Sequence, residues 1–90
     1  MITGYQFWDA GMSLSSKERE WADRARQFVK AELKRANVSY HELAQRLKEH
    51  GLEETEASIA NKLSRGTFAA TFFLATMKAI GREQVNLGDL

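Results

Sequence analysis

The chain has 90 residues, of which 43% are hydrophobic and 28% are charged, a composition that is ordinary for a single soluble domain. It contains no cysteine, which excludes a disulfide framework, a thiolate zinc site and a cysteine nucleophile. It also contains no proline, and its glycines fall mostly at expected breaks, which favours long helices over strands. Together these features predict an all-α domain of four to five helices.

The charged residues are unevenly distributed, although the net charge is only +1. Residues 17–36 carry seven basic and four acidic residues, and residues 61–82 carry four basic residues and no acid. These two basic blocks could form one face suited to a polyanion. The chain shows no secretory signal at its start and no segment of membrane-spanning length, so we expect a cytoplasmic protein without membrane contact.

The first 14 residues contain several large apolar side chains without helical spacing or strand alternation, and we expect them to form an N-terminal arm. Because such side chains are costly to expose, the arm should pack on its own domain or on a second copy. A helix over 16–36 should follow, since Ser15 and Glu18 form a capping box and Asn37 suits its end. Its buried stripe is predicted from steps of three and four and consists of Trp21, Ala25, Phe28, Val29, Leu33 and Ala36.

A second helix should begin with another capping box, formed by Ser39 and Glu42, and should end before Gly51. Its apolar side consists of Tyr40, Leu43, Ala44 and Leu47. After a turn over 52–54, Thr55 can cap a short helix over 56–65 that buries Ile59 and Leu63. The order of these two helices is the skeleton of a helix-turn-helix motif.

The short helix carries a polar stripe at positions i, i+3, i+4 and i+7, formed by Ser58, Asn61, Lys62 and Arg65. Asparagine can form two hydrogen bonds with adenine, and arginine can do so with guanine or grip a phosphate. The stripe therefore has the chemistry to read a major groove. The alternative is an ordinary solvated face, which any small helical bundle can present.

Gly66 should end this helix, and Thr67 should cap a strongly apolar helix through Ile80 that forms the centre of the core. Its apolar residues exceed one stripe, and we expect some of the excess to meet the arm or a partner, most readily Phe68, Phe72 and Leu74. Residues 15–82 then form the domain. Residues 83–90 form a tail with weak alternation, expected to be extended.

No catalytic constellation or phosphate-binding loop is evident, so we expect no enzymatic activity and no cofactor. His41 and His50 have acidic neighbours but lack the spacing of metal ligands and a third ligand, so no metal site is expected.

With the motif placed, Leu43-Ala44, Ile59, Leu63, Arg65-Gly66 and Ala79-Ile80-Gly81 resemble the lambda-repressor-like, Cro/C1-type helix-turn-helix domains. The stretches KAELKRANVSYHELAQRL and NKLSRGTFAATFFLATMKAIG look similar to small uncharacterised bacterial proteins of that class. The resemblance covers residues 30–81 and implies a compact helical DNA-binding fold, with residues 56–64 as the recognition helix. The chain departs from the usual pattern in a longer first helix and turn, and in having Ser64 where many such domains carry an acid.

The first hypothesis is therefore a small dimeric transcriptional regulator that binds double-stranded DNA. Ser58, Asn61 and Lys62 would read bases, while Arg65 and Lys78 would hold phosphates, and a homodimer would form through the arm and the helix from Phe68 to Ile80. Three acids near the start of the recognition helix, Glu53, Glu54 and Glu56, would repel phosphates. The alternative hypothesis is a helical interaction module, an adaptor or antitoxin-like partner, that does not bind DNA.

Overall fold

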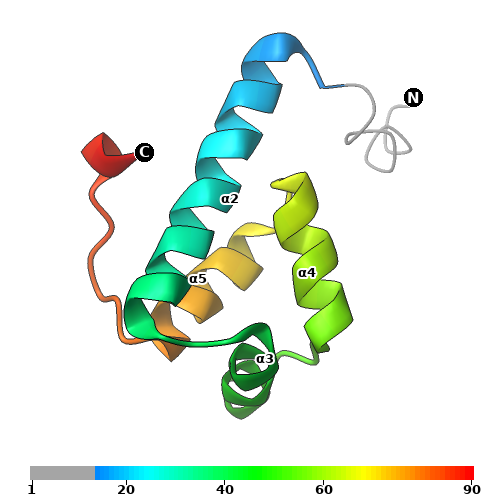
Figure 1. Ribbon diagram of the computed structural model, residues 1–90, viewed down its shortest axis with the longest axis vertical. Helices are drawn as coiled ribbons and strands as arrows, with labels where there is room; N and C mark the ends of the chain where they lie inside the picture. The colour runs from blue at the N-terminus through cyan, green and yellow to red at the C-terminus, as the bar shows by residue number, and fades with distance from the viewer. Residues whose placement is uncertain (1–13) are drawn as a thin grey trace.

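The computed structural model describes residues 14–90, so the predicted N-terminal arm lies almost entirely outside the described residues. Within this part of the chain the fold is all-α, as predicted. It comprises α2 (Ser16–Ala36), α3 (Tyr40–Glu49), α4 (Glu56–Arg65), α5 (Ala70–Ala79) and the 3-10 turn η1 (Leu87–Asp89). The long α2 runs along one side of the molecule, α3 closes one end, and α4 and α5 lie beside α2 (Figure 1).

The predicted bounds and caps of α2 are confirmed. Ser15 accepts a hydrogen bond from the backbone N–H of Glu18, whose carboxylate accepts one from the N–H of Ser15, and Asn37 ends the helix in the left-handed region with φ 59°. The stripe is buried at Phe28, Val29 and Leu33. It is not buried at Trp21, which is 61% exposed, or at Ala36, so the prediction was wrong at both ends.

The next two helices also have the expected bounds, but their caps differ from the prediction. Ser39 accepts from the N–H of Glu42, whose carboxylate binds Arg46 instead of returning to Ser39, so only half of the predicted capping box forms. A complete reciprocal box occurs where it was not predicted, between Thr55 and Ser58 at the start of α4. Ser58 thus has a structural role at the end of the α3–α4 turn.

The start of α5 was placed too early. The helix begins at Ala70, its N-cap is Ala69 and no side chain caps it, while Thr67 lies in the preceding extended loop. Residues 67–69 are needed to carry the chain from α4 across to α5. They place the ring of Phe68 beside that of Phe72, with 5.4 Å between the two ring centroids.

The core lies where the helices converge and is formed by buried residues from each of them and from the α2–α3 loop: Phe28, Val29, Leu33, Val38, Leu43, Leu47, Ile59, Leu63, Phe72 and Met77. Because Phe72 is 2% exposed, it does not belong to the surplus apolar surface, whereas Leu74 is 64% exposed and does. No helix within residues 14–90 is both long and apolar enough to cross a membrane.

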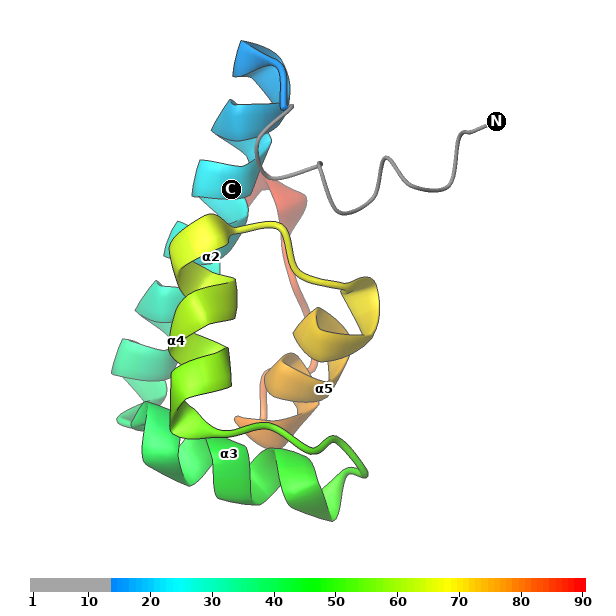
Figure 2. The same ribbon diagram turned by 90° about the vertical axis from the view of Figure 1, so that its right-hand side faces the viewer.

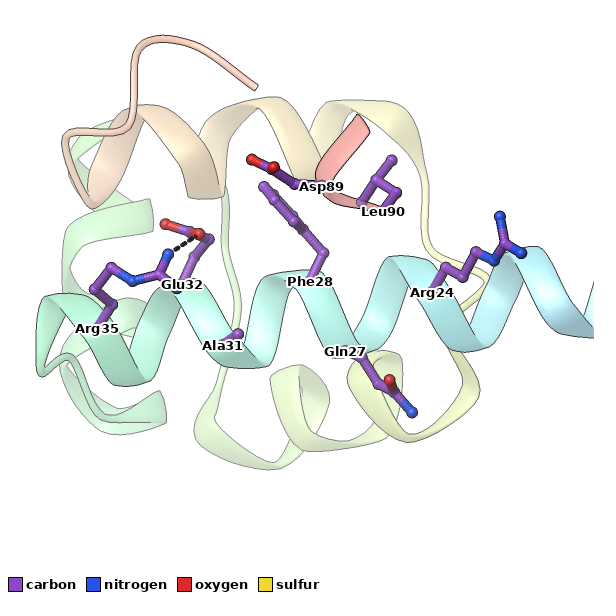
Figure 3. Close-up of a pocket in the computed structure, with 8 residues that line it drawn as sticks. All are labelled: Arg24, Gln27, Phe28, Ala31, Glu32, Arg35, Asp89 and Leu90. Carbon is purple, nitrogen blue, oxygen red and sulfur yellow. Dashed lines mark hydrogen bonds and ion pairs between the residues drawn. The ribbon is translucent and has the colours of Figure 1, made fainter. Parts of the chain in front are cut away.

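The C-terminal segment is not the extended tail that its alternation predicted. It returns along α2 and ends in η1, with Asp89 and Leu90 beside Phe28 (Figure 3). Arg82 anchors it, because its guanidinium donates to the buried carboxylate of Glu32 at 2.8 Å. The tail thereby covers the side of α2 that carries Phe28 and Glu32.

Candidate nucleic-acid interface

Helix α4 is fixed firmly against α2 and the core. Ile59 and Leu63 are fully buried, and Gly66 ends the helix in the left-handed region with φ 75°. A Cβ atom at Gly66 would lie only 2.3 Å from the backbone oxygen of Ala22 on α2. Arg19 also donates from Nη1 to the backbone oxygen of Arg65 at 3.4 Å. These contacts hold α4 in one orientation.

The predicted polar stripe divides into two halves, of which one is engaged within the protein. Ser58 Oγ donates to Glu54 Oε1 at 2.6 Å, and Lys62 Nζ lies 3.0 Å from Glu54 Oε2. Lys62 Nζ also lies 5.6 Å from the centroid of the Phe72 ring. The side chain of Glu54 is only 10% exposed. The cluster is therefore largely shielded from solvent, and it lies between the α3–α4 turn and Phe72 of α5.

The other half of the stripe faces solvent. Asn61 and Arg65 are exposed, and their side chains make no hydrogen bond or ion pair with any other residue in the range 14–90. Beside them, the small residues Ala57, Ala60 and Ser64 complete the outward face of α4. Figure 2 shows α4 on the near side of the molecule, in front of α2. No other described helix covers this face.

The acidic cluster is smaller in the structure than in the sequence, because Glu54 is neutralised by Lys62. Glu53 and Glu56 remain exposed at the N-terminal end of α4. The outward face is thus acidic at its start, neutral along its middle and basic at Arg65. A phosphate would be favoured at the Arg65 end.

Glu54 is the member of this cluster whose pairing was not predicted from the sequence. It was placed among three acids that would repel phosphates, but Glu54, Ser58 and Lys62 follow one another at steps of four. That spacing is the signal that could have indicated the cluster. Lys78, the remaining predicted site residue, is exposed near the end of α5, and no described contact joins it to α4.

Both histidines lie on the surface, at opposite ends of α3. His50 is the C-cap residue, and its Nδ1 lies 3.0 Å from the backbone oxygen of Arg46. Between residues 14 and 90 no group of three or more histidine or acidic side chains is arranged to hold a metal ion.

Comparison with known proteins places the chain in a family. No curated protein and no solved structure matches the chain significantly. The model of one family, described as "Domain of unknown function (DUF6471)", matches residues 21–85. This range includes all of α3, α4 and α5, most of α2 and the start of the returning C-terminal segment. The chain therefore belongs to the DUF6471 family.

Proposed function

We propose that this protein is a sequence-specific DNA-binding protein, a small transcriptional regulator that inserts α4 into a major groove. The observation that carries the proposal is the outward face of α4, where Asn61 and Arg65 are exposed and unengaged on a helix that the core holds rigidly. A rigid helix with unoccupied hydrogen-bonding groups can present them to base edges at little entropic cost.

The exposed side chains have distinct roles in this proposal. Asn61 forms two hydrogen bonds with an adenine, and the methyl groups of Ala57 and Ala60 allow the helix backbone to approach the groove floor closely. Arg65 binds a guanine or a phosphate at the C-terminal end of α4. Lys62 reads no base while it is paired with Glu54, and it serves to hold the turn that orients the helix.

A homodimer is part of the proposal, because a single small domain with so few open cations would bind DNA weakly. Its interface is the exposed side of α5. There Leu74 is 64% exposed beside a groove of about 440 Å³, which is lined by the apolar residues Phe73, Met77 and Val85 and by the charged residues Lys78, Arg82 and Glu83. A second copy offers the same mixed surface in return, as a two-fold contact requires, with Leu74 as its apolar centre.

The test begins with selection of the purified protein on a genomic DNA pool at about 50 and 200 mM salt, followed by sequencing. We expect a palindromic motif with salt-sensitive affinity. The double variant Asn61→Ala/Arg65→Ala should then lose at least tenfold in affinity for that motif. The matched control is Gln27→Ala/Arg24→Ala on the exposed surface of α2, which also removes one amide and one cation and should retain most of the affinity. If the folded wild-type protein retains no DNA, the proposal is wrong.

A second candidate function, a helical protein-interaction module, is favoured by the exposed apolar residues. Trp21, Leu74 and Leu87 are each more than 60% exposed. Salt dependence separates the two candidates. DNA binding weakens steeply as salt is added, whereas binding to a protein through apolar contacts hardly responds.

A further inference from the structure

A ridge of three cations runs along α2. Arg26, Lys30 and Lys34 follow one another at steps of four and therefore lie on one side of the helix over about 12 Å. Lys30 and Lys34 are exposed and have no acidic partner in residues 14–90, while Arg26 pairs with Asp23 at the surface. The ridge is thus a mainly unneutralised basic surface.

The ridge begins where α2 meets the proposed DNA-reading helix. The backbone of Ala22 is in close contact with Gly66 at the end of α4, and Arg26 follows Ala22 by one turn. Lys30 and Lys34 continue from there, turning gradually away from the contact at about 40° per step of four residues. Arg65 precedes Gly66 directly, and Arg26 follows Ala22 by one turn, so one cation of each helix lies next to this crossing.

The other cations of α2 are differently placed. Arg35 pairs with the buried Glu32, on the side of α2 that the C-terminal segment covers (Figure 3). Arg24 lies with its guanidinium carbon 5.0 Å from the centroid of the Trp21 ring. Lys17 is exposed without a described partner as well, but it lies on another side of the helix, in its first turn. Lys30 and Lys34 are the unpartnered lysines that continue from the contact with α4.

We propose that Arg26, Lys30 and Lys34 bind the phosphate backbone of DNA along the edge of the groove that α4 enters. This inference rests on the proposed function, and it assigns to α2 most of the positioning contacts, since α4 offers only Arg65 for them. One DNA strand carries a phosphate about every 3.4 Å along the axis, so a ridge of about 12 Å spans roughly three phosphates. Contacts of this kind fix the orientation of the protein on the duplex and carry no sequence information.

The test compares two double variants that remove equal charge from exposed positions of the same helix. Lys30→Ala/Lys34→Ala removes part of the ridge, and Lys17→Ala/Arg24→Ala is the control. Binding to the motif selected by the wild-type protein is measured between about 50 and 200 mM salt. The ridge variant should reduce the slope of log K against log salt by about 3.6 for a bound dimer, because each protomer loses two phosphate contacts and each contact accounts for about 0.9. The control should change the slope by less than half as much.

The sequence motif recovered by the ridge variant should equal that of the wild-type protein, since phosphate contacts do not read bases. An unchanged slope, or an equal change in the control, would contradict the proposal that the ridge binds phosphates. Either result would leave the proposed function of α4 intact. Loss of the motif with an unchanged slope also contradicts the proposal for the ridge. If the wild-type protein binds no DNA at either salt concentration, both the ridge and the proposed function are wrong. Circular dichroism of both variants verifies that each is folded.

Discussion

Gly66 lies at the closest approach between α4 and α2, and its lack of a side chain is a steric requirement. In Gly66→Ala the new Cβ would lie 2.3 Å from the Ala22 oxygen and would also occupy a backbone conformation with φ 75°. We expect a loss of about 3 kcal/mol in unfolding free energy, of which roughly 1 reflects the backbone conformation and the rest the clash. Urea unfolding followed by circular dichroism measures the change.

Gly51 offers a matched control for this substitution. It has a similar φ of 88°, but a Cβ there would meet no heavy atom within 4 Å. Gly51→Ala should therefore cost only about 1 kcal/mol, the conformational part alone. Equal losses in the two variants would mean that the contact with Ala22 contributes nothing, and that α4 is held by its apolar residues only.

Glu54 stabilises the α3–α4 turn by pairing with Lys62, and in the proposed function this pairing also withholds Lys62 from DNA. Glu54→Gln removes an ion pair that is largely shielded from solvent, so we expect a loss of about 1 to 2 kcal/mol in unfolding free energy. We also expect tighter DNA binding, because a negative charge is removed and Lys62 is released. Denaturant unfolding and a binding titration on the selected motif measure the two effects.

A substitution of the adjacent Glu53 separates the effect of the lost negative charge from the effect of releasing Lys62. Glu53→Gln removes the same charge from an exposed side chain and should change stability by less than about 0.5 kcal/mol. The change in DNA affinity caused by Glu53→Gln therefore measures the effect of removing one negative charge without releasing Lys62. If Glu54→Gln binds DNA no more tightly than Glu53→Gln, release of Lys62 has no part in binding.

Trp21 and Lys62 show that helical periodicity does not determine whether a single side chain is buried or paired. The spacing of Trp21 places it correctly on the stripe that contains Phe28, yet no described element lies opposite this turn of α2, and Trp21 is exposed. Spacing also placed Lys62 beside Asn61, but it could not indicate that a turn residue, Glu54, would reach back to it. A sequence pattern identifies a face, whereas burial and pairing depend on what the fold places against that face.

At the scale of the element, the sequence predicted helices best where side chains cap them. Ser15, Ser39 and Thr55 each accept a hydrogen bond from a backbone N–H, and α2, α3 and α4 begin where these residues predicted. Helix α5 has no such cap, and its start was misplaced by attributing a capping role to Thr67. Its position is determined by packing of Phe72 in the core, which a local pattern does not contain.

The uncapped start of α5 predicts a stabilising substitution. Ala69 is exposed and has φ −68° and ψ 151°, a backbone conformation typical of an N-cap residue. Ala69→Ser should therefore raise the unfolding free energy by about 0.5 to 1 kcal/mol, by providing an acceptor for a free N–H of the first turn. Ala60→Ser in the middle of α4 is the control and should lower stability by about 0.5 kcal/mol. Thermal unfolding of both variants tests this, and equal shifts would exclude a capping effect.

At the scale of the whole molecule, local patterns determined the order of the helices but not the path of the C-terminal segment. Its return along α2 depends on Arg82, whose partner Glu32 lies 50 residues earlier in the chain. Glu32 was not on the predicted stripe, which consisted of apolar residues only, and burying an acid is costly without partners. Arg35 and Arg82 supply them, and together they make burial of the carboxylate possible.

The proposed homodimer provides the last prediction, which concerns the molecule as a unit. Leu74→Glu places a charge in the proposed α5 interface, and because Leu74 is 64% exposed the monomer should retain its fold. We expect sedimentation to show a shift from dimer to monomer, together with a loss of at least tenfold in affinity for a palindromic site, since two linked domains bind more tightly than one. Leu87→Glu, at a residue that is 76% exposed in the C-terminal segment, is the control and should remain dimeric. Dissociation by Leu87→Glu with a persistent dimer in Leu74→Glu would move the interface from α5 to the C-terminal segment and would change the half-site spacing that the dimer requires.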